Sequence, residues 1–316
     1  MNSIWELLLG VAGGVLLYFG ADYLVSGGVG IARKLRIPSL VIGLTMVAFG
    51  TSAPELTVSI DAALRGKGDI AVGNVVGSNI CNLALILGLC AAVKALPVNK
   101  AVLKVDLPVM TSATLVLVGV LYFTGGVPRW GGAVLIVLMA SYITFLFINS
   151  KRNAEAQAAL TGDIEDNGEK SLLRSLIEFG CGLAALVFGA KLFVSGAVCA
   201  AKLMHVPEAV IALTIVAIGT SLPELAASLI ATIRGETDIA VGNIVGSNIW
   251  NILYIMGISP LIKPIRLEHI SPFDLGAVTA VSLLAIPFFI TGRRISRGEG
   301  IFWLLSYGTY LFLLIK

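Results

Sequence analysis

The feature that most constrains the fold is a succession of long apolar stretches separated by short polar connections. About 20 apolar residues in a helix are enough to cross the hydrocarbon core of a bilayer. Only 13% of the 316 residues are charged, whereas a soluble domain carries about 25%. The sequence therefore predicts an all-α integral membrane protein with ten transmembrane helices, over residues 4–26, 38–64, 70–93, 105–124, 130–149, 171–199, 208–233, 239–262, 273–291 and 300–315.

The longest connection, residues 150–170, is rich in charged residues, so we expect a polar linker between a first half (1–149) and a second half (171–316). Basic residues in short loops stay preferentially in the cytoplasm. Fourteen Lys and Arg residues fall in the connections after the odd-numbered helices and seven on the other side. We therefore expect a multi-pass protein of the cell (inner) membrane, with a cytoplasmic linker and both termini facing away from the cytoplasm.

The two halves contain an internal repeat. Residues 50–88 read GTSAPELTVSIDAALRGKGDIAVGNVVGSNICNLALILG, and residues 219–257 match them without a gap at 24 of 39 positions. The offset is 169 residues, or five predicted helices. Because five is odd, equivalent helices must cross the membrane in opposite directions, which predicts two inverted five-helix repeats. Secondary transporters use this architecture and hold their substrate between the repeats near the membrane midplane.

Two carboxylates lie deep within predicted membrane helices, Glu55 in the first repeat and Glu224 in the second. A charged group is costly there, so an intramembrane carboxylate indicates a functional site by default. Pro54 and Pro223 directly precede them, and a proline inside a helix removes a backbone hydrogen bond and displaces a carbonyl. We therefore expect both helices to be broken beside the glutamates, with backbone oxygens available to a cation.

Further polar residues share helix faces with these glutamates or lie on the following helix, since residues four apart lie on one face. The glutamate faces carry Thr51, Glu55 and Ser59, and Thr220, Glu224 and Ser228, with Ser52 and Ser221 beside them. The next helices carry Asn74, Ser78 and Asn82, and Asn243, Ser247 and Asn251. We expect hydrogen bonds between helices from Asn79 and Asn248, and close helix packing at Gly73, Gly77, Gly242 and Gly246.

This set of carboxylates, hydroxyls and amides contains no His, Cys or Met, so it predicts a site for a hard cation with oxygen ligands. Calcium takes 6–8 such ligands with flexible geometry, and sodium tolerates similar surroundings. Two ionised glutamates balance one calcium ion or two sodium ions. One load therefore excludes the other, which favours exchange over co-transport.

The two motifs, GTSAPEL with AVGNVVGSNICN and GTSLPEL with AVGNIVGSNIWN, resemble the two α-repeats of the calcium/cation antiporter superfamily, in particular its prokaryotic sodium/calcium exchanger branch. The resemblance extends over nearly the whole chain. It implies four central cation sites and a first and sixth helix that slide across a fixed core as a gate.

The resemblance also implies the ligands, including two backbone carbonyls that spacing alone does not single out. These residues are Ala48, Thr51, Ser52, Glu55, Ser78 and Asn82 in the first repeat, and Ala217, Thr220, Ser221, Glu224, Ser247 and Asn251 in the second. One departure concerns Asn251, because many relatives carry Asp at that position. A neutral amide there bears on stoichiometry and calcium affinity and argues against a potassium requirement.

The leading hypothesis is an electrogenic antiporter that exports calcium against sodium entry. The alternative is a calcium/proton antiporter on the same scaffold, and a cation channel is a third possibility. No motif indicates an enzyme, and we expect no cofactor beyond the transported calcium and sodium ions. The net charge of +3 is too small and scattered for a nucleic-acid partner, and apart from the ions and the lipid bilayer no obligatory protein partner is evident.

Overall fold

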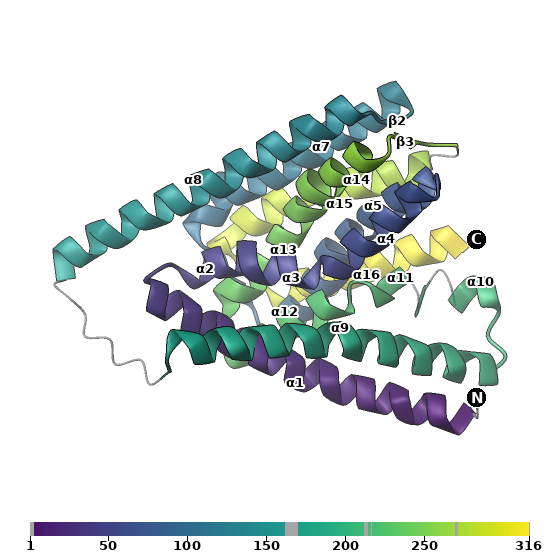
Figure 1. Cartoon of the computed structure of the whole chain (residues 1–316), viewed down its shortest axis with the longest axis horizontal. Coiled ribbons are helices and arrows are strands. Elements are labelled where there is room, and N and C mark those ends of the chain that lie inside the picture. Colours follow the sequence, from purple (N-terminus) through teal and green to yellow (C-terminus); the bar gives the residue numbers. More distant parts are fainter. Residues whose placement is uncertain (1–2, 162–169, 212–213, 216, 269–270, 316) are drawn as a thin grey trace.

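The computed structural model describes residues 3–161, 170–211, 214–215, 217–268 and 271–315, and they are almost entirely helical (Figure 1). The elements of the first half are α1 (Ser3–Leu35), α2 (Ser39–Ile42), η1 (Gly43–Val47), α3 (Ala48–Thr51), α4 (Ala53–Leu64), α5 (Gly68–Ile80), η2 (Cys81–Ile86), α6 (Leu87–Val93), β1 (Leu96–Pro97), η3 (Val102–Asp106), α7 (Leu107–Thr124), β2 (Gly126–Val127) and α8 (Arg129–Thr161).

The second half repeats this order. Its elements are α9 (Leu172–Leu203), α10 (Glu208–Ile211), α11 (Ala217–Gly219), α12 (Leu222–Arg234), α13 (Thr237–Ile249), η5 (Trp250–Ile255), α14 (Met256–Ile262), β3 (Ile265–Arg266), α15 (Pro272–Ile290), η6 (Thr291–Arg293), β4 (Arg294–Ile295) and α16 (Arg297–Ile315). The segments η1, η2, η3 and η5 are π-helical.

Seven helices in the described residues are long and apolar enough to cross a membrane, and the bent pair Ser39–Thr51 and Ala53–Leu64 makes an eighth span if counted as one. The expected span over residues 208–233 includes residues outside the described ranges, and α16, which contains 300–315, is not among the seven, so the predicted count of ten spans stays a prediction. The chain is therefore a multi-pass, all-helical membrane protein.

Two helices continue well past the ends that the sequence predicts. α1 runs to Leu35 instead of residue 26, and α8 runs to Thr161 instead of residue 149. The start of the expected linker is thus helical, whereas residues 162–169 lie outside the described ranges. Polarity ends a membrane span but not a helix, because Lys, Arg, Glu and Ala, which are frequent at the end of α8, are good helix formers.

α1 and α9 lie side by side, antiparallel, along one edge of the molecule (Figure 1). Their backbones touch at glycines: a Cβ added at Gly10 would lie 2.8 Å from the Cα of Gly196, and one added at Gly20 would lie 3.0 Å from the carbonyl oxygen of Gly182. Small residues permit this close approach of membrane helices. α1 also packs against α12.

Short strands, which the sequence did not predict, join the two halves. β1 pairs antiparallel with β4, and β2 pairs antiparallel with β3. Helix packing crosses between the halves in the same way, with α6 against α16 and α14 against α8. The halves are therefore interlocked, and the central polar residues of each face the other.

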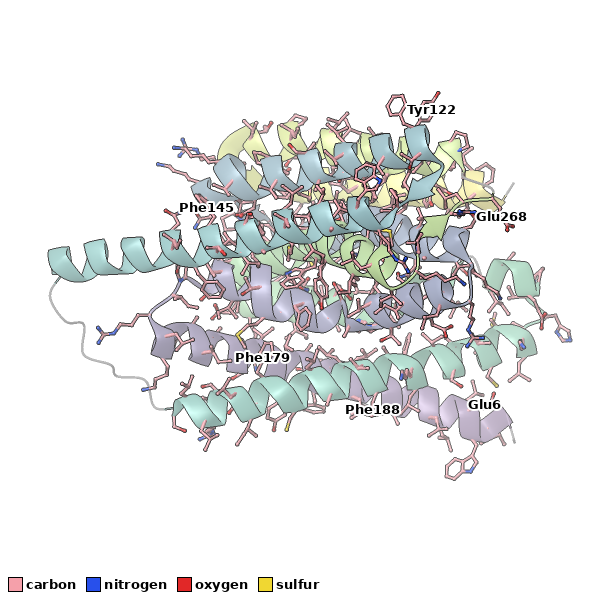
Figure 2. All side chains as sticks on the ribbon, turned by 45° about the horizontal axis from the view of Figure 1, so that its top comes forward. Glu6, Tyr122, Phe145, Phe179, Phe188 and Glu268 are labelled. Carbon is pink, nitrogen blue, oxygen red and sulfur yellow. The ribbon has the colours of Figure 1, made fainter. Side chains whose placement is uncertain are left out.

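The outer surface is apolar. Figure 2 shows Tyr122, Phe145 and Phe188 projecting from the periphery of α7, α8 and α9, and these side chains are 75%, 47% and 64% exposed. Many large apolar side chains at the periphery are what a surface in contact with lipid requires.

Candidate cation site

Both glutamates lie directly after a break in a helix. α3 ends at Thr51 and α4 begins at Ala53, and the helix direction changes by 47° between the two parts. In the second half, Thr220 and Ser221 separate α11 from α12. Pro54 and Pro223 occupy the first turns of α4 and α12, where their missing N–H groups cost nothing. The predicted breaks are confirmed.

The two glutamates are buried and face serines of the opposite half. Glu55 is 0% exposed and Glu224 is 1% exposed. Ser221 donates a hydrogen bond to Oε1 of Glu55 at 3.2 Å, and Ser52 donates to Oε1 of Glu224 at 2.8 Å. Ser78 of α5 also donates to Oε1 of Glu55, at 3.3 Å. The breaks of the two halves therefore meet at one centre.

Two asparagines hold the segments that carry the glutamates. The Nδ2 group of Asn74 donates to the backbone carbonyl of Glu55 at 3.0 Å and to Ser59 Oγ at 2.9 Å. Asn243 makes the equivalent bonds to the carbonyl of Glu224 at 3.4 Å and to Ser228 Oγ at 2.9 Å. These amides position the glutamate backbone in both halves. The sequence placed them on the polar stripes without distinguishing this supporting role from that of a ligand.

Several buried oxygens at this centre have no hydrogen-bond partner among the described residues. The set comprises Glu55 Oε2, Glu224 Oε2, Asn82 Oδ1, Ser247 Oγ and Asn251 Oδ1. An unsatisfied buried oxygen is costly, and each one in a native structure calls for an explanation such as a bound ion. All five belong to residues that the resemblance implies as ligands, whereas Asn248 Oδ1, which is also unpartnered, does not.

The remaining expected ligands differ in their surroundings. The Thr51 hydroxyl is fully buried and lies 3.1 Å from both the Val47 carbonyl and Asn243 Oδ1. The Ala48 carbonyl accepts the N–H of Ser52 at 3.1 Å and lies 3.4 Å from the Thr51 hydroxyl. In the second half, Ala217 begins α11 and Thr220 is half-buried in the turn that follows.

The expected hydrogen bond between the third and eighth spans is confirmed for Asn79 and wrong for the Asn248 side chain, which donates to the Ile244 carbonyl of its own helix at 2.7 Å. Asn79 donates to the carbonyl of Asn248 at 3.4 Å, and Asn251 Nδ2 donates to Asn79 Oδ1 at 3.0 Å. Asn251 is therefore held by a donor that an aspartate would lack.

The packing prediction for the glycines is right in one half and wrong in the other. A Cβ at Gly242 would lie 2.8 Å from the Leu40 carbonyl, whereas a Cβ at Gly73 or Gly77 would have no described atom within 4 Å. Gly73 and Gly77 line a pocket of about 110 Å³ beside α15 and α16. The repeated sequence thus meets two different environments, which no sequence motif records.

One further contact escaped the sequence reasoning. Trp250, at the position equivalent to Cys81, donates its indole N–H to the Leu44 carbonyl at 3.0 Å and packs against Phe49 and Tyr254. It fixes η1 of the first half to η5 of the second. The signal was present in the sequence as one of two large aromatic replacements near the end of the second motif, the other being Tyr254 for Leu85.

The chemistry of the centre is that of a hard-cation site. Its side chains offer carboxylate, hydroxyl and amide oxygens, and no cluster of three or more His, Cys, Asp and Glu suited to a metal occurs in the described residues. Two buried carboxylates supply up to two negative charges in a low dielectric, where a cation is held strongly. The arrangement can bind dehydrated cations.

Comparisons with known proteins agree with this geometry. A family profile described as "Sodium/calcium exchanger protein" matches residues 5–148 and 174–316. The chain is 37% identical over 312 residues to "Putative antiporter CaxA" of Alkalimonas amylolytica, covering 97% of each protein. It is 34% identical over 352 residues to the sodium/calcium exchanger MaX1 of Methanosarcina acetivorans, covering 98% of this chain and 97% of that one.

A solved structure of the sodium-calcium exchanger NCX_Mj, soaked with 2.5 mM Na⁺ and 10 mM Sr²⁺, has a TM-score of 0.82 to this chain at 32% identity. The match covers 96% of this chain and 97% of that one. With both a profile match over most of its length and full-length relatives above 30% identity, this chain belongs to the sodium/calcium exchanger family of membrane cation transporters.

Proposed function

We propose that this protein is a secondary antiporter that exchanges calcium for sodium by alternating access and exports calcium. The observation that carries the proposal is the set of five unpartnered buried oxygens around Glu55 and Glu224. Relatives and a solved structure named as sodium/calcium exchangers support the choice of ions.

The proposed ligands are the twelve residues that the family resemblance implies, Ala48 and Ala217 through their carbonyls. Glu55 and Glu224 are shared by both cargoes. One calcium ion or two sodium ions neutralise the two carboxylates, and a site carrying both loads would hold excess positive charge in a low dielectric. Competition for the same carboxylates therefore couples the two fluxes.

The proposed architecture is two inverted repeats of five spans each, residues 1–149 and 171–316. The cross-half contacts support it, because they occur in equivalent pairs. At the repeat offset β1 corresponds to β3 and β2 to β4, so the β1–β4 and β2–β3 pairs are counterparts of each other, and Ser282 donates to Thr114 in the matching part of the other half at 3.3 Å. An inverted repeat places such pairs about a pseudo-twofold axis in the membrane plane.

We propose that the protein resides in the cell (inner) membrane with residues 150–170 in the cytoplasm and both termini outside. The start of α1 and the end of α16 lie at one end of the molecule, and the end of α8 and start of α9 lie at the other (Figure 1). The distribution of basic residues supports this orientation. In alternating access, the α1–α9 pair slides across the remaining helices.

Calcium uptake into sodium-loaded proteoliposomes tests the proposal. We expect sodium-dependent uptake that Glu55→Gln and Glu224→Gln abolish, because each removes a charge from the shared site. Glu268→Gln is the matched control, since Glu268 is exposed in a loop, and it should transport as the wild type does.

Other outcomes separate the alternatives. Uptake driven by a proton gradient, with no effect of sodium, would identify a calcium/proton antiporter. Uptake that needs no counter-gradient would indicate a channel. Sodium-driven uptake that survives both glutamine variants would refute the proposed site.

A further inference from the structure

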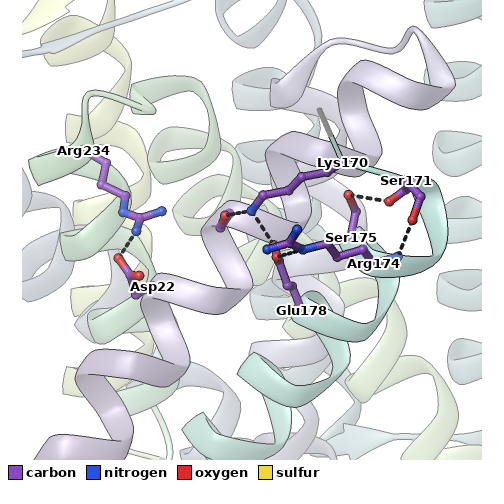
Figure 3. Close-up of polar contacts among 8 residues, drawn as sticks. Asp22, Lys170, Ser171, Arg174, Ser175, Glu178 and Arg234 are labelled. Atoms are coloured by element: carbon purple, nitrogen blue, oxygen red, sulfur yellow. Dashed lines mark hydrogen bonds and ion pairs between the residues drawn. The ribbon is translucent and has the colours of Figure 1, made fainter. Parts of the chain in front are cut away.

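One ion pair ties the α1–α9 pair to the rest of the molecule. Asp22 of α1 forms a salt bridge with Arg234 at the end of α12 (Figure 3). Arg234 is the last residue of α12, next to a connection that we propose faces the cytoplasm. The contact therefore spans the boundary between a sliding helix and the core, on the side where α1 packs against α12.

A second polar cluster in the same view has a different role. Lys170 donates to Ser26 of α1 at 2.8 Å and to Glu178 of α9 at 2.7 Å, and Arg174 pairs with Glu178 at 3.2 Å (Figure 3). These bonds connect α1 with α9, so they persist if the two helices move together. Among the described residues, no hydrogen bond or ion pair of this cluster joins α1 or α9 to the other helices, whereas the Asp22–Arg234 salt bridge joins α1 to α12.

The inverted repeat predicts what the opposite state would bring together. At the repeat offset of 169 residues, Asp22 corresponds to Lys191 and Arg234 to Arg65. Both counterparts are cations, so the mirror-image contact between α9 and α4 would place like charges near each other, which is unfavourable.

Arg65 has an acidic partner on its own helix, whereas Arg234 has none among the described residues of α12. Arg65 is paired within its own helix with Asp61 at 2.8 Å. The residue equivalent to Asp61 in the second half is Ile230, which offers Arg234 no local partner. Arg234 therefore reaches α1, while Arg65 stays on α4.

We propose that Asp22–Arg234 is an electrostatic latch that favours the access state closed toward the cytoplasm, and that Lys191 with Arg65 disfavours the opposite state. The inference rests on the proposed alternating access. It makes the two access states unequal in energy although the repeats that generate them are similar. Asp22, Arg234 and Lys191 act as positioning residues and touch no transported ion.

The expected size of the effect is modest. The side chains of Arg234 and Asp22 are 39% and 31% exposed, so water and salt screen their attraction. Pairs of this kind change an equilibrium by roughly two- to five-fold. Added salt should weaken the latch, because it screens exposed pairs.

Hydrogen–deuterium exchange of the full chain in lipid nanodiscs, free of sodium and calcium, tests the proposal. Asp22→Asn should speed amide exchange by two- to five-fold in residues 27–47, on the proposed cytoplasmic side, and slow it near the end of α4 on the other side. Lys191→Glu should shift exchange in the same direction, because it gives Arg65 a partner in the opposite state. The double variant D22R/R234D should restore the wild-type pattern.

Opposite changes on the two sides distinguish a shift between states from a loss of stability. Asp22→Asn overturns the proposal if it leaves exchange unchanged or raises it equally on both sides, as does a failure of D22R/R234D to restore the pattern. Calcium flux is not the readout. Loss of the proposed ion specificity would therefore appear in the transport assay and leave this result unaffected.

Discussion

Adding a single methyl group to a glycine of α1, where it faces α9, should lower the stability of the protein at one position and not at another. At Gly20, an added Cβ would lie 2.9 Å from the backbone nitrogen of Leu186 and 3.0 Å from the carbonyl oxygen of Gly182. At Gly14, its nearest contact would be the Phe193 ring at 3.7 Å. Gly20→Ala therefore tests the helix contact, and Gly14→Ala is its matched control.

The distances set the magnitude. Ordinary contacts begin near 3.4 Å, so the two backbones must separate by about 0.5 Å at Gly20. Overpacking of a well-packed contact costs about 1–3 kcal/mol, while replacing a helical glycine by alanine gains about 0.5–1 kcal/mol. The difference between these ranges is a net loss of up to about 2.5 kcal/mol for Gly20→Ala, centred on about 1 kcal/mol, whereas Gly14→Ala should gain up to about 1 kcal/mol.

Thermal unfolding in detergent, followed by tryptophan fluorescence, measures the difference. We expect a Tm several degrees lower for Gly20→Ala and an unchanged or higher Tm for Gly14→Ala. If Gly20→Ala is as stable as the wild type, or if both variants lose stability equally, the close backbone contact does not hold the two helices together and the reasoning fails.

Three further predictions concern the centre. Calcium uptake should fall in mild acid, because protons compete with cations for the buried glutamate pair; an activity that is flat from acidic to neutral pH would contradict this. Asn251→Asp removes the donor to Asn79, so the free energy of unfolding of the calcium-free protein should fall by about 1–3 kcal/mol. Calcium should then raise the Tm of the variant more than that of the wild type. An unchanged calcium-free Tm would speak against the contact. Trp250→Phe removes the bond to the Leu44 carbonyl and should cost about 0.5–1.5 kcal/mol, less than Trp250→Leu, which also loses the ring contact with Phe49. An unchanged Tm for Trp250→Phe would refute the role of the indole N–H, and equal Tm losses in the two variants would refute that of the ring contact.

Local patterns predicted much of this molecule. Long apolar stretches can be stable only in a bilayer, and Pro54 and Pro223 break their helices by covalent geometry that needs no tertiary context. Glu55 and Glu224 were identifiable because a carboxylate is rare where it is most costly. Helix ends were less predictable, since the polar residues after residue 149 stop the membrane span but favour continued helix.

Contacts between the halves depended on the fold. Ser52 reaches Glu224 and Ser221 reaches Glu55, and a motif contained within one repeat cannot reveal that its serine serves the other repeat's glutamate. Gly73 and Gly242 occupy the same place in the two motifs, yet one lines a pocket and the other is packed against α2. Such differences arise from long-range packing.

The sequence alone therefore determined the membrane class, the repeated halves and the residues able to offer oxygen to a cation, because hydropathy, proline geometry and charge cost act locally. The tertiary structure decided which of those oxygens are left without partners, which asparagines support the glutamates, and that Asp22 meets Arg234. These depend on how two similar halves are positioned against each other, and the shared positions of two motifs cannot encode the difference by themselves.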